Sequence, residues 1–485
     1  MGSIASFHAT GLRAAACEVD ITDCGERSYR GVPLADCSIH DRPRARLLLL
    51  SGEAGEMLWI SADECSFRRQ AHDSIIAAIA EAGGIPTWRV MLAGNHVHSV
   101  HSYQTFSSGL FIKAILPLLP ELRANLRRTA RLAVRCARTP ADAPVINRRV
   151  AFGFLGQHCC MFNDGCRLDG VRGQLDATAQ LAAEAQRLGS SLDALGLTEA
   201  ANWTNGPVDD RLHLATILDE GDRPIASIAR VNAHPVTASQ SRVGPVISAD
   251  YIRPLEDAIR AATDGAPCLV FNGAFGDTRP LQREYSVAEA ARIGRAWAAA
   301  MLAMPADVQS LSDANLATST ESLPLRRDVP GDRAGLASLR SSLEDEAASA
   351  GRAEASPAVA RQRKLLAERL ETIALLQRPP PPEHHGILLH GELERGSVEF
   401  RLQAWRLGTL RLLACGGEPF ALLAQSIEES SGLLVLGVAG AYASYLPDPA
   451  SCAGGSYEAA ECLFDPATLT RLPGFAAILA KELTA

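Results

Sequence analysis

Three histidines stand close together in the stretch "NHVHSVH", directly after an apolar run with the composition of a buried strand. They are His96, His98 and His101, in a chain of 485 residues that has only 12 histidines. Imidazole is the commonest metal ligand in proteins and the usual group for proton transfer near neutral pH. A histidine at a strand end can equally be an ordinary hydrogen-bonded residue, so the cluster indicates chemistry only if other segments add to it.

Other segments offer the groups that a metal site needs. Residues two apart in extended backbone face the same way, so we expect His96 and His98 to point into one cavity. A third imidazole is available from His234 at the end of a predicted hairpin, and a carboxylate from Glu418 in "GGEPF". Two histidines and a carboxylate from separate segments are the usual ligands of a catalytic zinc ion. A loop rich in Gly and Pro adds Tyr442, Tyr445 and Tyr457.

Apolar periodicity places these groups in loops between regular elements. Runs of strand length alternate with stretches of helical spacing, which is typical of a mixed α/β fold. In the first part of the chain we expect a hairpin over 45–61, a helix over 72–82, a strand over 89–94, a hairpin over 213–235 and a strand over 267–271. Ser286 and Glu289 form a capping box, which predicts the start of a long helix.

The C-terminal part predicts strands over 398–405 and 410–415, followed by a helix that begins at Glu418 and Pro419. Residues 331–382 are charged and rich in Ala up to a closing run of prolines, and they predict a helical insertion on the surface. No repeat occurs along the chain. We therefore expect one large α/β (mixed α+β) domain over residues 1–485.

The composition favours a globular protein that acts on a small molecule. Hydrophobic residues make up 47% of the chain, and the formal net charge is −8 without any basic block. This charge pattern gives no indication of binding to nucleic acid or to an anionic membrane. The chain starts without the basic and apolar pattern of a secretory signal, and no long apolar segment follows, so we expect a cytoplasmic protein without stable membrane association.

The 12 cysteines are scattered along the chain and include no C-x-x-C pair. Scattered cysteines in a chain without a secretory signal are expected to be reduced and mostly buried. Cys159 and Cys160 stand beside His158 and leave a thiol nucleophile open as a minor alternative to the metal site.

The ordered motifs resemble those of the neutral/alkaline non-lysosomal ceramidase family. The similarity covers about Cys17 to Glu461, from "VDITD" and "IHDRPRARLLLL" through "NHVHS", "NAHP", "GDTRP" and "GGEPF" to "YASY" and a final "YE". Each motif is short, but several in the right order are more specific than any one. The resemblance implies a ceramidase-like catalytic domain and a Zn²⁺ cofactor.

The resemblance also implies a role for individual residues. The zinc ligands of the family correspond here to His96, His234, Glu418 and Tyr445. Three catalytic positions correspond to His98 beside the metal-bound water, Arg148 facing the substrate and Tyr457 polarising the scissile carbonyl. The implied reaction is zinc-dependent hydrolysis of an amide bond by a metal-bound water. The open alternatives are an ester, lactone or cyclic amide as the cleaved bond, and a metal-binding protein without catalysis.

Two departures from the family bear on the substrate. Ceramidases of the family have a serine directly before the proline of the "GD" turn, where this chain has Arg279 preceded by Thr278. The chain also ends soon after Tyr457, without the C-terminal immunoglobulin-like domain of secreted members. We therefore expect a soluble or acyl-bearing small molecule as substrate. Arg279 and Thr278 are candidate substrate contacts, although Arg279 could instead pair with Asp277 and stiffen the turn.

Overall fold

The structure is a computed structural model. It describes residues 4–25, 36–100, 106–147, 207–238, 246–282, 284–325, 395–449 and 462–483, with a few shorter pieces between these ranges. Most of the predicted insertion at 331–382 lies outside the described residues, so the single domain with this insertion stays a prediction.

Two large sheets form the centre of the described part of the chain. A nine-stranded sheet contains β2 (Arg13–Asp20), β6 (Arg44–Gly52), β7 (Gly55–Ala62), β8 (Val90–Gly94), β9 (Arg127–Arg138), β11 (Arg211–Asp219), β12 (Pro224–Val231), β14 (Cys268–Asn272) and β16 (Asp307–Ser310). A five-stranded sheet contains β1 (Ala5–Thr10), β17 (Asp313–Pro324), β18 (Ser397–Leu407), β19 (Leu410–Cys415) and β21 (Leu434–Leu436). Most neighbouring strands are antiparallel, but β7 and β8, β12 and β14, and β19 and β21 run parallel.

Four short strand pairs lie in the connections. They are β3 (Ser28–Tyr29) with β4 (Val32–Pro33), β5 (Ser38–Ile39) with β13 (Val246–Ile247), β10 (Val145–Asn147) with β15 (Thr278–Pro280), and β20 (Gly417–Pro419) with β22 (Ser444–Leu446). The last two pairs include the predicted residues Thr278, Arg279, Glu418 and Tyr445.

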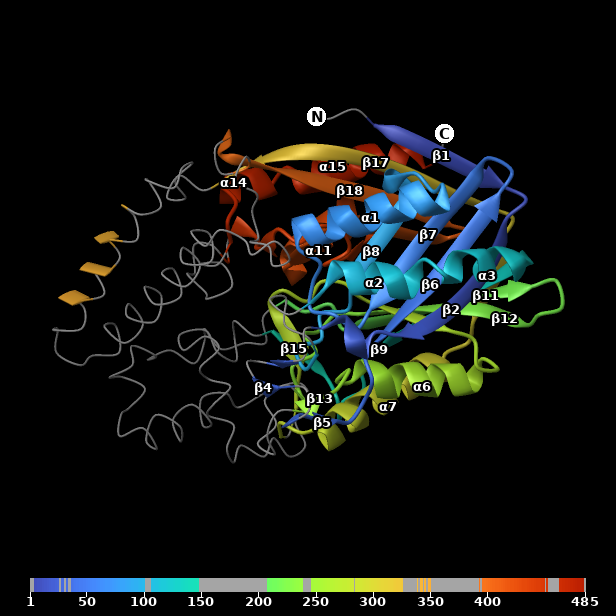
Figure 1. The fold of residues 1–485 in the computed structure, drawn as a ribbon, viewed down its shortest axis with the longest axis horizontal. Coiled ribbons are helices and arrows are strands. Elements are labelled where there is room, and N and C mark those ends of the chain that lie inside the picture. The colour runs from blue at the N-terminus through green and yellow to red at the C-terminus, as the bar shows by residue number, and fades with distance from the viewer. Residues whose placement is uncertain are drawn as a thin grey trace.

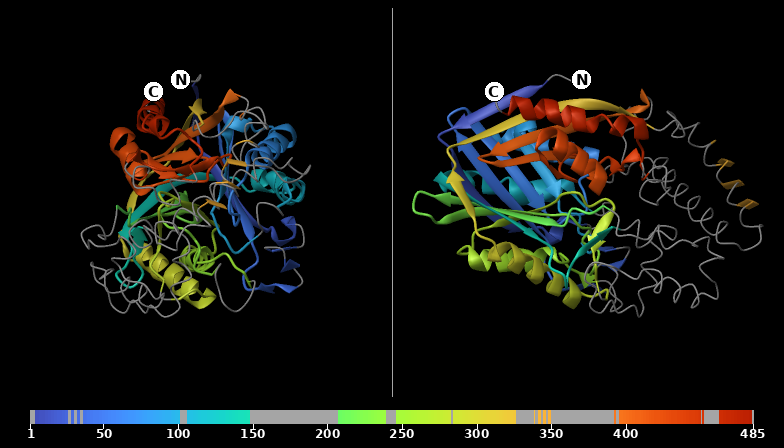
Figure 2. Two further views of the ribbon diagram at one scale, coloured as in Figure 1. Left: turned by 90° about the vertical axis from the view of Figure 1, so that its left-hand side faces the viewer. Right: turned by 180° about the vertical axis from the view of Figure 1, so that it is seen from behind.

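Helices cover the outer face of each large sheet, which gives four layers (Figures 1 and 2). The nine-stranded sheet is covered by α1 (Arg69–Gly83), α2 (Ser108–Ile115), α3 (Leu118–Ala124), α6 (Ile252–Ala262) and α7 (Val287–Ala303). The five-stranded sheet is covered by α11 (Ala421–Ser431), α14 (Pro466–Leu469) and α15 (Leu472–Glu482). The mixed α/β class predicted from the sequence is confirmed.

The layers follow from which face of each strand is apolar. Leu48 and Leu50 of β6 contact the core between the sheets, whereas Leu47 and Leu49 contact the core under α1 to α3. Because alternate strand residues point to opposite faces, a run of leucines fills both cores at once. Trp405 of β18 reaches the inter-sheet core from the other sheet, where its ring lies 5.2 Å from that of Trp59.

The local elements agree with most of the sequence predictions. Both predicted hairpins form, as β6 with β7 and as β11 with β12, and the predicted helix and strand before the histidines are α1 and β8. Ser286 caps α7 by accepting a hydrogen bond from the Glu289 amide. The prediction that a helix begins at Glu418 and Pro419 is wrong. These residues form β20, and the helix begins at Ala421, because β20 pairs with the distant strand β22.

The nine-stranded sheet curls so that its two edges meet at the carboxyl ends of β8 and β14. These strands stand at opposite ends of the strand order, yet the Asn272 side-chain amide donates to the Asn95 carbonyl (2.5 Å). Ser61 at the end of β7 donates to the Val270 carbonyl (2.6 Å). Loops that follow parallel strands therefore come together at one place.

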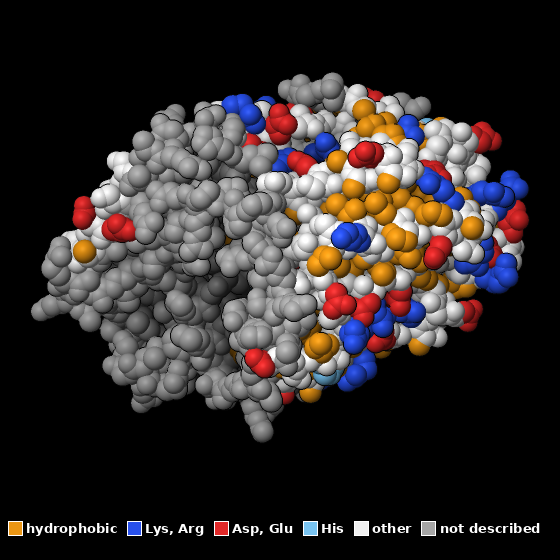
Figure 3. Space-filling view, in the orientation of Figure 1, with side chains coloured by type: hydrophobic (Ala, Val, Ile, Leu, Met, Phe, Trp, Pro, Cys, Tyr) orange, Lys and Arg blue, Asp and Glu red, His pale blue; other side chains and the backbone are white. Residues whose placement is uncertain are grey.

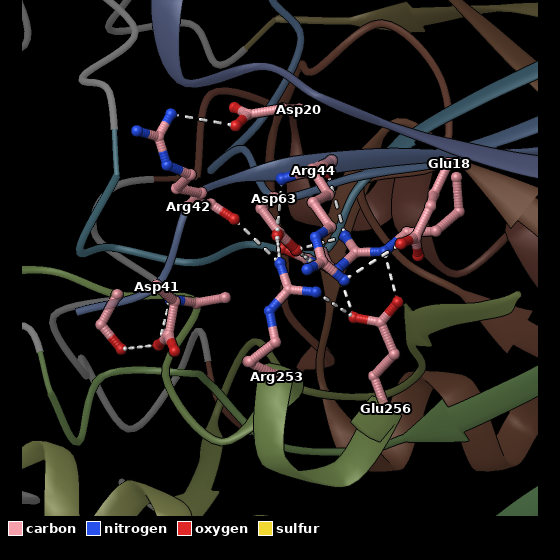
Figure 4. Close-up of polar contacts among 12 residues, drawn as sticks. Glu18, Asp20, Asp41, Arg42, Arg44, Asp63, Arg253 and Glu256 are labelled. Carbon is pink, nitrogen blue, oxygen red and sulfur yellow. Dashed lines mark hydrogen bonds and ion pairs between the residues drawn. The ribbon is translucent and has the colours of Figure 1, made fainter. Parts of the chain in front are cut away.

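A buried ion network fixes this meeting point (Figure 4). Arg46 of β6 bonds to Asp63 (2.5 Å) and also pairs with Glu256 of α6, and all three side chains are at most 1% exposed. Arg253 bridges the same two carboxylates from α6 (3.0 and 2.8 Å). Burial alone would raise the pKa of Asp63, but the two guanidinium groups outweigh it and hold that pKa below its ordinary value. The Asn95 side chain donates to Asp63 (2.6 Å), which connects the network to the residue before His96.

The surface of the described part mixes both charges with apolar groups (Figure 3). In this view apolar side chains gather over α1 and α2, where Leu110 is 42% exposed. Among the described residues, no helix is both long and apolar enough to cross a bilayer.

Candidate metal centre

His96 lies two residues beyond β8 in a left-handed backbone conformation (φ +62°). This conformation is uncommon for a residue other than glycine and costs roughly 1–3 kcal/mol, so its surroundings must hold it. The His96 amide donates to the Glu64 carbonyl (3.0 Å), and its ring Nδ1 donates to the Cys65 carbonyl (2.8 Å). The expected extended backbone is therefore wrong here, because these bonds to the end of β7 turn the chain at His96.

His234 is held in the same manner beyond β12. Its amide donates to the Thr278 carbonyl (3.0 Å), and its Nδ1 donates to the Phe275 carbonyl (2.7 Å). A carbonyl only accepts, so Nδ1 carries the proton in both histidines and each Nε2 presents a lone pair. A backbone carbonyl that fixes the tautomer in this way is the usual partner of a metal-bound histidine.

Glu418 and Tyr445 are register partners in the parallel pair of β20 and β22. Residues opposite each other in neighbouring strands project from the same face, so both side chains reach the histidines. The rings of His234 and Tyr445 stack with centroids 6.5 Å apart. Gly276 allows the loop after β14 to approach β20, since a Cβ at this position would lie 2.4 Å from the Glu418 carbonyl oxygen.

The ligand atoms of His96, His234 and Glu418 converge. Glu418 Oε2 lies 3.1 Å from Nε2 of His234 and 3.5 Å from Nε2 of His96. Tetrahedral zinc with nitrogen and oxygen ligands separates such atoms by about 3.3 Å. Oε2 is buried and has no hydrogen-bond partner among the described residues. Burial, more than any neighbouring charge, holds the pKa of His96 well below its usual range.

Two lone pairs and a carboxylate oxygen that face one another in a buried space repel unless a cation lies between them. The described residues therefore fit a divalent cation held by His96, His234 and Glu418, with Tyr445 beside them.

Tyr442 also contacts the candidate metal centre, a position that was not predicted for it from the sequence. Its hydroxyl donates to Glu418 Oε1 (2.7 Å), the oxygen on the side away from the histidines. Burial and the nearby Glu418 carboxylate raise the pKa of Tyr442 well above its usual value, so it stays a donor. Its spacing of three residues from Tyr445 was the available signal, but the pairing of β20 with β22 was needed to interpret it.

We expect Tyr442→Phe to weaken zinc binding about 10- to 100-fold, the usual effect of removing a partner that orients a metal ligand. Competition with a chromophoric chelator measures the zinc affinity, and the melting temperature of the metal-free protein is the control for folding. Equal zinc affinity in the two proteins would show that the hydroxyl does not orient Glu418.

His98 lies beside the predicted ligands and is half-buried. Its ring centroid is 4.8 Å from that of His96 and 5.7 Å from that of His234. Its Nε2 lies 4.0 Å from the Sγ of Cys65, a residue that sequence reasoning did not select. Cys65 lies three residues after β7, and β7 is the parallel neighbour of β8, the strand that precedes His96. This position after a neighbouring parallel strand was the signal that could have identified Cys65.

The structure describes only part of the predicted substrate-binding set. Thr278 is fully buried and its hydroxyl donates to the Asn232 carbonyl (2.7 Å), so its geometry gives the substrate role no support. Arg279 is 3% exposed, and Nη1 donates to the Tyr285 hydroxyl (3.0 Å). Outside the described residues are Arg148, Tyr457, His101, Cys159 and Cys160.

Asp277, the suggested partner of Arg279, is engaged by neighbouring loops. It accepts hydrogen bonds from the Asn147 side chain (2.9 Å) and the Ala421 amide (2.8 Å). These bonds tie the loop after β14 to β10 and to the start of α11. A stiffening role for Asp277 therefore does not depend on Arg279.

Comparison with solved structures identifies the fold as that of the neutral ceramidases. Neutral ceramidase from Pseudomonas aeruginosa superposes with a TM-score of 0.61 at 16% identity, over 97% of this chain and 74% of that chain. A ceramidase complexed with C2 gives a TM-score of 0.62 at 14% identity, over 98% of this chain and 75% of that chain. The resemblance inferred from the motifs is thereby confirmed for the fold. No protein-family model and no curated protein matches the sequence.

Proposed function

We propose that this chain is a zinc-dependent hydrolase that cleaves an amide bond in a soluble or acyl-bearing small molecule. The observation that carries the proposal is the convergence of two imidazole lone pairs on Oε2 of Glu418, which has no hydrogen-bond partner in the described part of the chain. The neutral-ceramidase-like fold supports an amide as the cleaved bond. A small molecule as the partner, without nucleic acid or stable membrane association, and a cytoplasmic location are further parts of this proposal.

Zinc bound by His96, His234, Glu418 and Tyr445 would polarise the scissile carbonyl and lower the pKa of a water molecule. His98 lies beside this site but is not one of the residues whose ligand atoms converge there, which are His96, His234 and Glu418. Its ring is half-buried and stays accessible to solvent. It accepts the proton of the attacking water and returns it to the leaving amine. Arg148 and Tyr457 keep their predicted roles toward the substrate and its carbonyl.

Paired substrates test the reaction. Metal-depleted protein is refilled with one equivalent of zinc and given amides and esters that share the same acyl group. Amide cleavage that appears only with zinc would support the proposal. Cleavage of esters or lactones with the amides intact would identify the alternative reaction. Bound zinc without cleavage across the whole panel would favour a non-catalytic metal-binding protein.

His98→Ala is expected to keep most of its zinc and to lose about 10²- to 10⁴-fold in kcat, the usual contribution of a general acid–base group. Zinc content by elemental analysis and kcat on the same sample separate the two effects. Loss of zinc together with activity would make His98 a ligand.

If Arg279 selects an acidic substrate, Arg279→Ser is expected to lower kcat/KM for carboxylate-bearing substrates and to spare neutral ones. The loss in kcat/KM should correspond to about 2–3 kcal/mol of transition-state stabilisation. Arg279 follows Thr278, whose carbonyl accepts the His234 amide, so it stands next to the site. Tyr285→Phe removes the hydroxyl that Arg279 contacts and serves as the matched control. Equal losses for acidic and neutral substrates would leave Arg279 with a structural role.

A further inference from the structure

Cys65 and His98 place a thiol and an imidazole nitrogen 4.0 Å apart on the other edge of the His96 ring from Glu418. Cys65 Sγ also lies 3.7 Å from Nδ1 of His96. Zinc bound to one sulfur and one nitrogen separates these ligand atoms by about 3.6 Å, so a small movement of either side chain makes them a chelating pair.

We propose that Cys65 and His98 form a second metal site, for a thiophilic divalent ion such as Zn²⁺ or Cd²⁺. Thiolate and imidazole together select such ions over Mg²⁺ or Ca²⁺. Binding forms bonds from the ion to Sγ and Nε2 and releases the thiol proton of Cys65 to solvent. Both side chains are partly exposed, so an ion can reach them.

The second site is distinct from the first, although His96 lies between them. Nε2 of His96 faces Glu418, whereas its Nδ1 is bonded to the Cys65 carbonyl (2.8 Å) and is not available as a ligand. The second ion thus has two protein ligands against at least three in the first site. We therefore expect it to bind more weakly and to enter after the first site is filled.

An ion bound to His98 would remove this histidine from proton transfer. The second site therefore makes excess zinc or cadmium an inhibitor, a consequence that rests on the proposed function. The binding itself does not depend on that function, so the two are tested separately.

Cadmium titration of the full chain, preloaded with one equivalent of zinc, tests the binding. A cadmium thiolate has an ultraviolet charge-transfer band that cadmium on nitrogen and oxygen ligands lacks. The titration is made in a Cys136→Ser background, because Cys136 lies 3.6 Å from Nε2 of His213 and meets the same spacing requirement. We expect the band in this background and its loss when Cys65→Ser is added. Cys17→Ser in the same background is the matched control, because Cys17 is also partly exposed. A band that survives Cys65→Ser, or that disappears in the Cys17→Ser control alone, would overturn the site.

Alkylation of the wild-type protein gives a second measurement that needs no variant. Cadmium is expected to protect Cys65 from iodoacetamide and to leave the alkylation of Cys17 unchanged, as read by peptide mass spectrometry. The same alkylation rate of Cys65 with and without cadmium contradicts the proposal.

Inhibition is tested separately, as the loss of kcat when cadmium is added to the zinc-loaded protein, relative to the same protein with zinc alone. A cadmium band that depends on Cys65, without any loss of kcat, would overturn the inhibition and the proton role of His98, while the site itself stands.

Discussion

His96→Ala and Glu418→Gln proteins are expected to purify without zinc and to lose hydrolytic activity by about 10³-fold or more. A Lewis acid contributes several kcal/mol to transition-state stabilisation, and each 1.4 kcal/mol is a factor of ten in rate. Glu418→Gln keeps the shape of the side chain and removes the charge that two neutral imidazoles cannot supply. His234→Ala should behave like His96→Ala, since each Nε2 lies within 3.5 Å of the same carboxylate oxygen.

Elemental analysis of the purified variants measures this result directly. His8→Ala is the matched control, because His8 is exposed and bonds to Asn315 outside the site (2.8 Å). It should keep its zinc and its activity. Full zinc in both His96→Ala and His234→Ala would show that the metal is held elsewhere. Activity that persists in metal-free Glu418→Gln would show that the reaction does not need zinc.

The sequence predicts the parts of this site that depend on local pattern. The apolar run of β8 ends before His96, so this histidine was expected in the loop beyond a strand, and His234 was expected at the end of the second hairpin. The ordered motifs then associated Glu418 and Tyr445 with them. Helix and strand periodicity suffices for such predictions because it reflects burial on one face of an element.

The geometry of the site depends on pairings between distant segments, which periodicity does not encode. Glu418 was expected at a helix start because "GEP" precedes a helical pattern, but its pairing with Tyr445 across 27 positions makes it a strand residue. His96 was expected in extended backbone, yet bonds to Glu64 and Cys65 hold it at positive φ. Each error has the same cause, a long-range hydrogen bond that outweighs the local preference.

The buried ion network is a further feature that the sequence did not reveal. Arg46 stands in the apolar run "ARLLLL", and nothing local indicates that its side chain is buried between Asp63 and Glu256. Asp63 follows β7 and Glu256 lies in α6, so the network exists only once the fold brings these segments together. The network also reaches the candidate metal centre, because Asp63 accepts a hydrogen bond from Asn95, the neighbour of His96.

Arg46→Met is expected to lower the free energy of unfolding by about 3–5 kcal/mol. The substitution leaves Asp63 and Glu256 with Arg253 as their remaining guanidinium partner in the network, and one buried negative charge is then uncompensated. Arg42→Met is the matched control at the edge of the same region (Figure 4), because Arg42 and its partner Asp20 are 65% and 44% exposed. Exposed pairs contribute about 0.2–1 kcal/mol. Urea unfolding of both variants measures the difference, and equal losses would contradict the role of the network.

The double variant Arg46→Met/Glu256→Gln tests the cause of this loss. Removing the charge of Glu256 leaves Asp63 paired with Arg253 (3.0 Å), so the buried charges balance again. If the uncompensated charge is the source of the instability, the double variant should be more stable than Arg46→Met alone, although a neutral amide is a weaker partner for Arg253 than the carboxylate. If lost packing or lost hydrogen bonds are the source, the second substitution should destabilise the protein further. The zinc affinity of both variants then reports whether Asp63 still holds Asn95 and, through it, the backbone of His96.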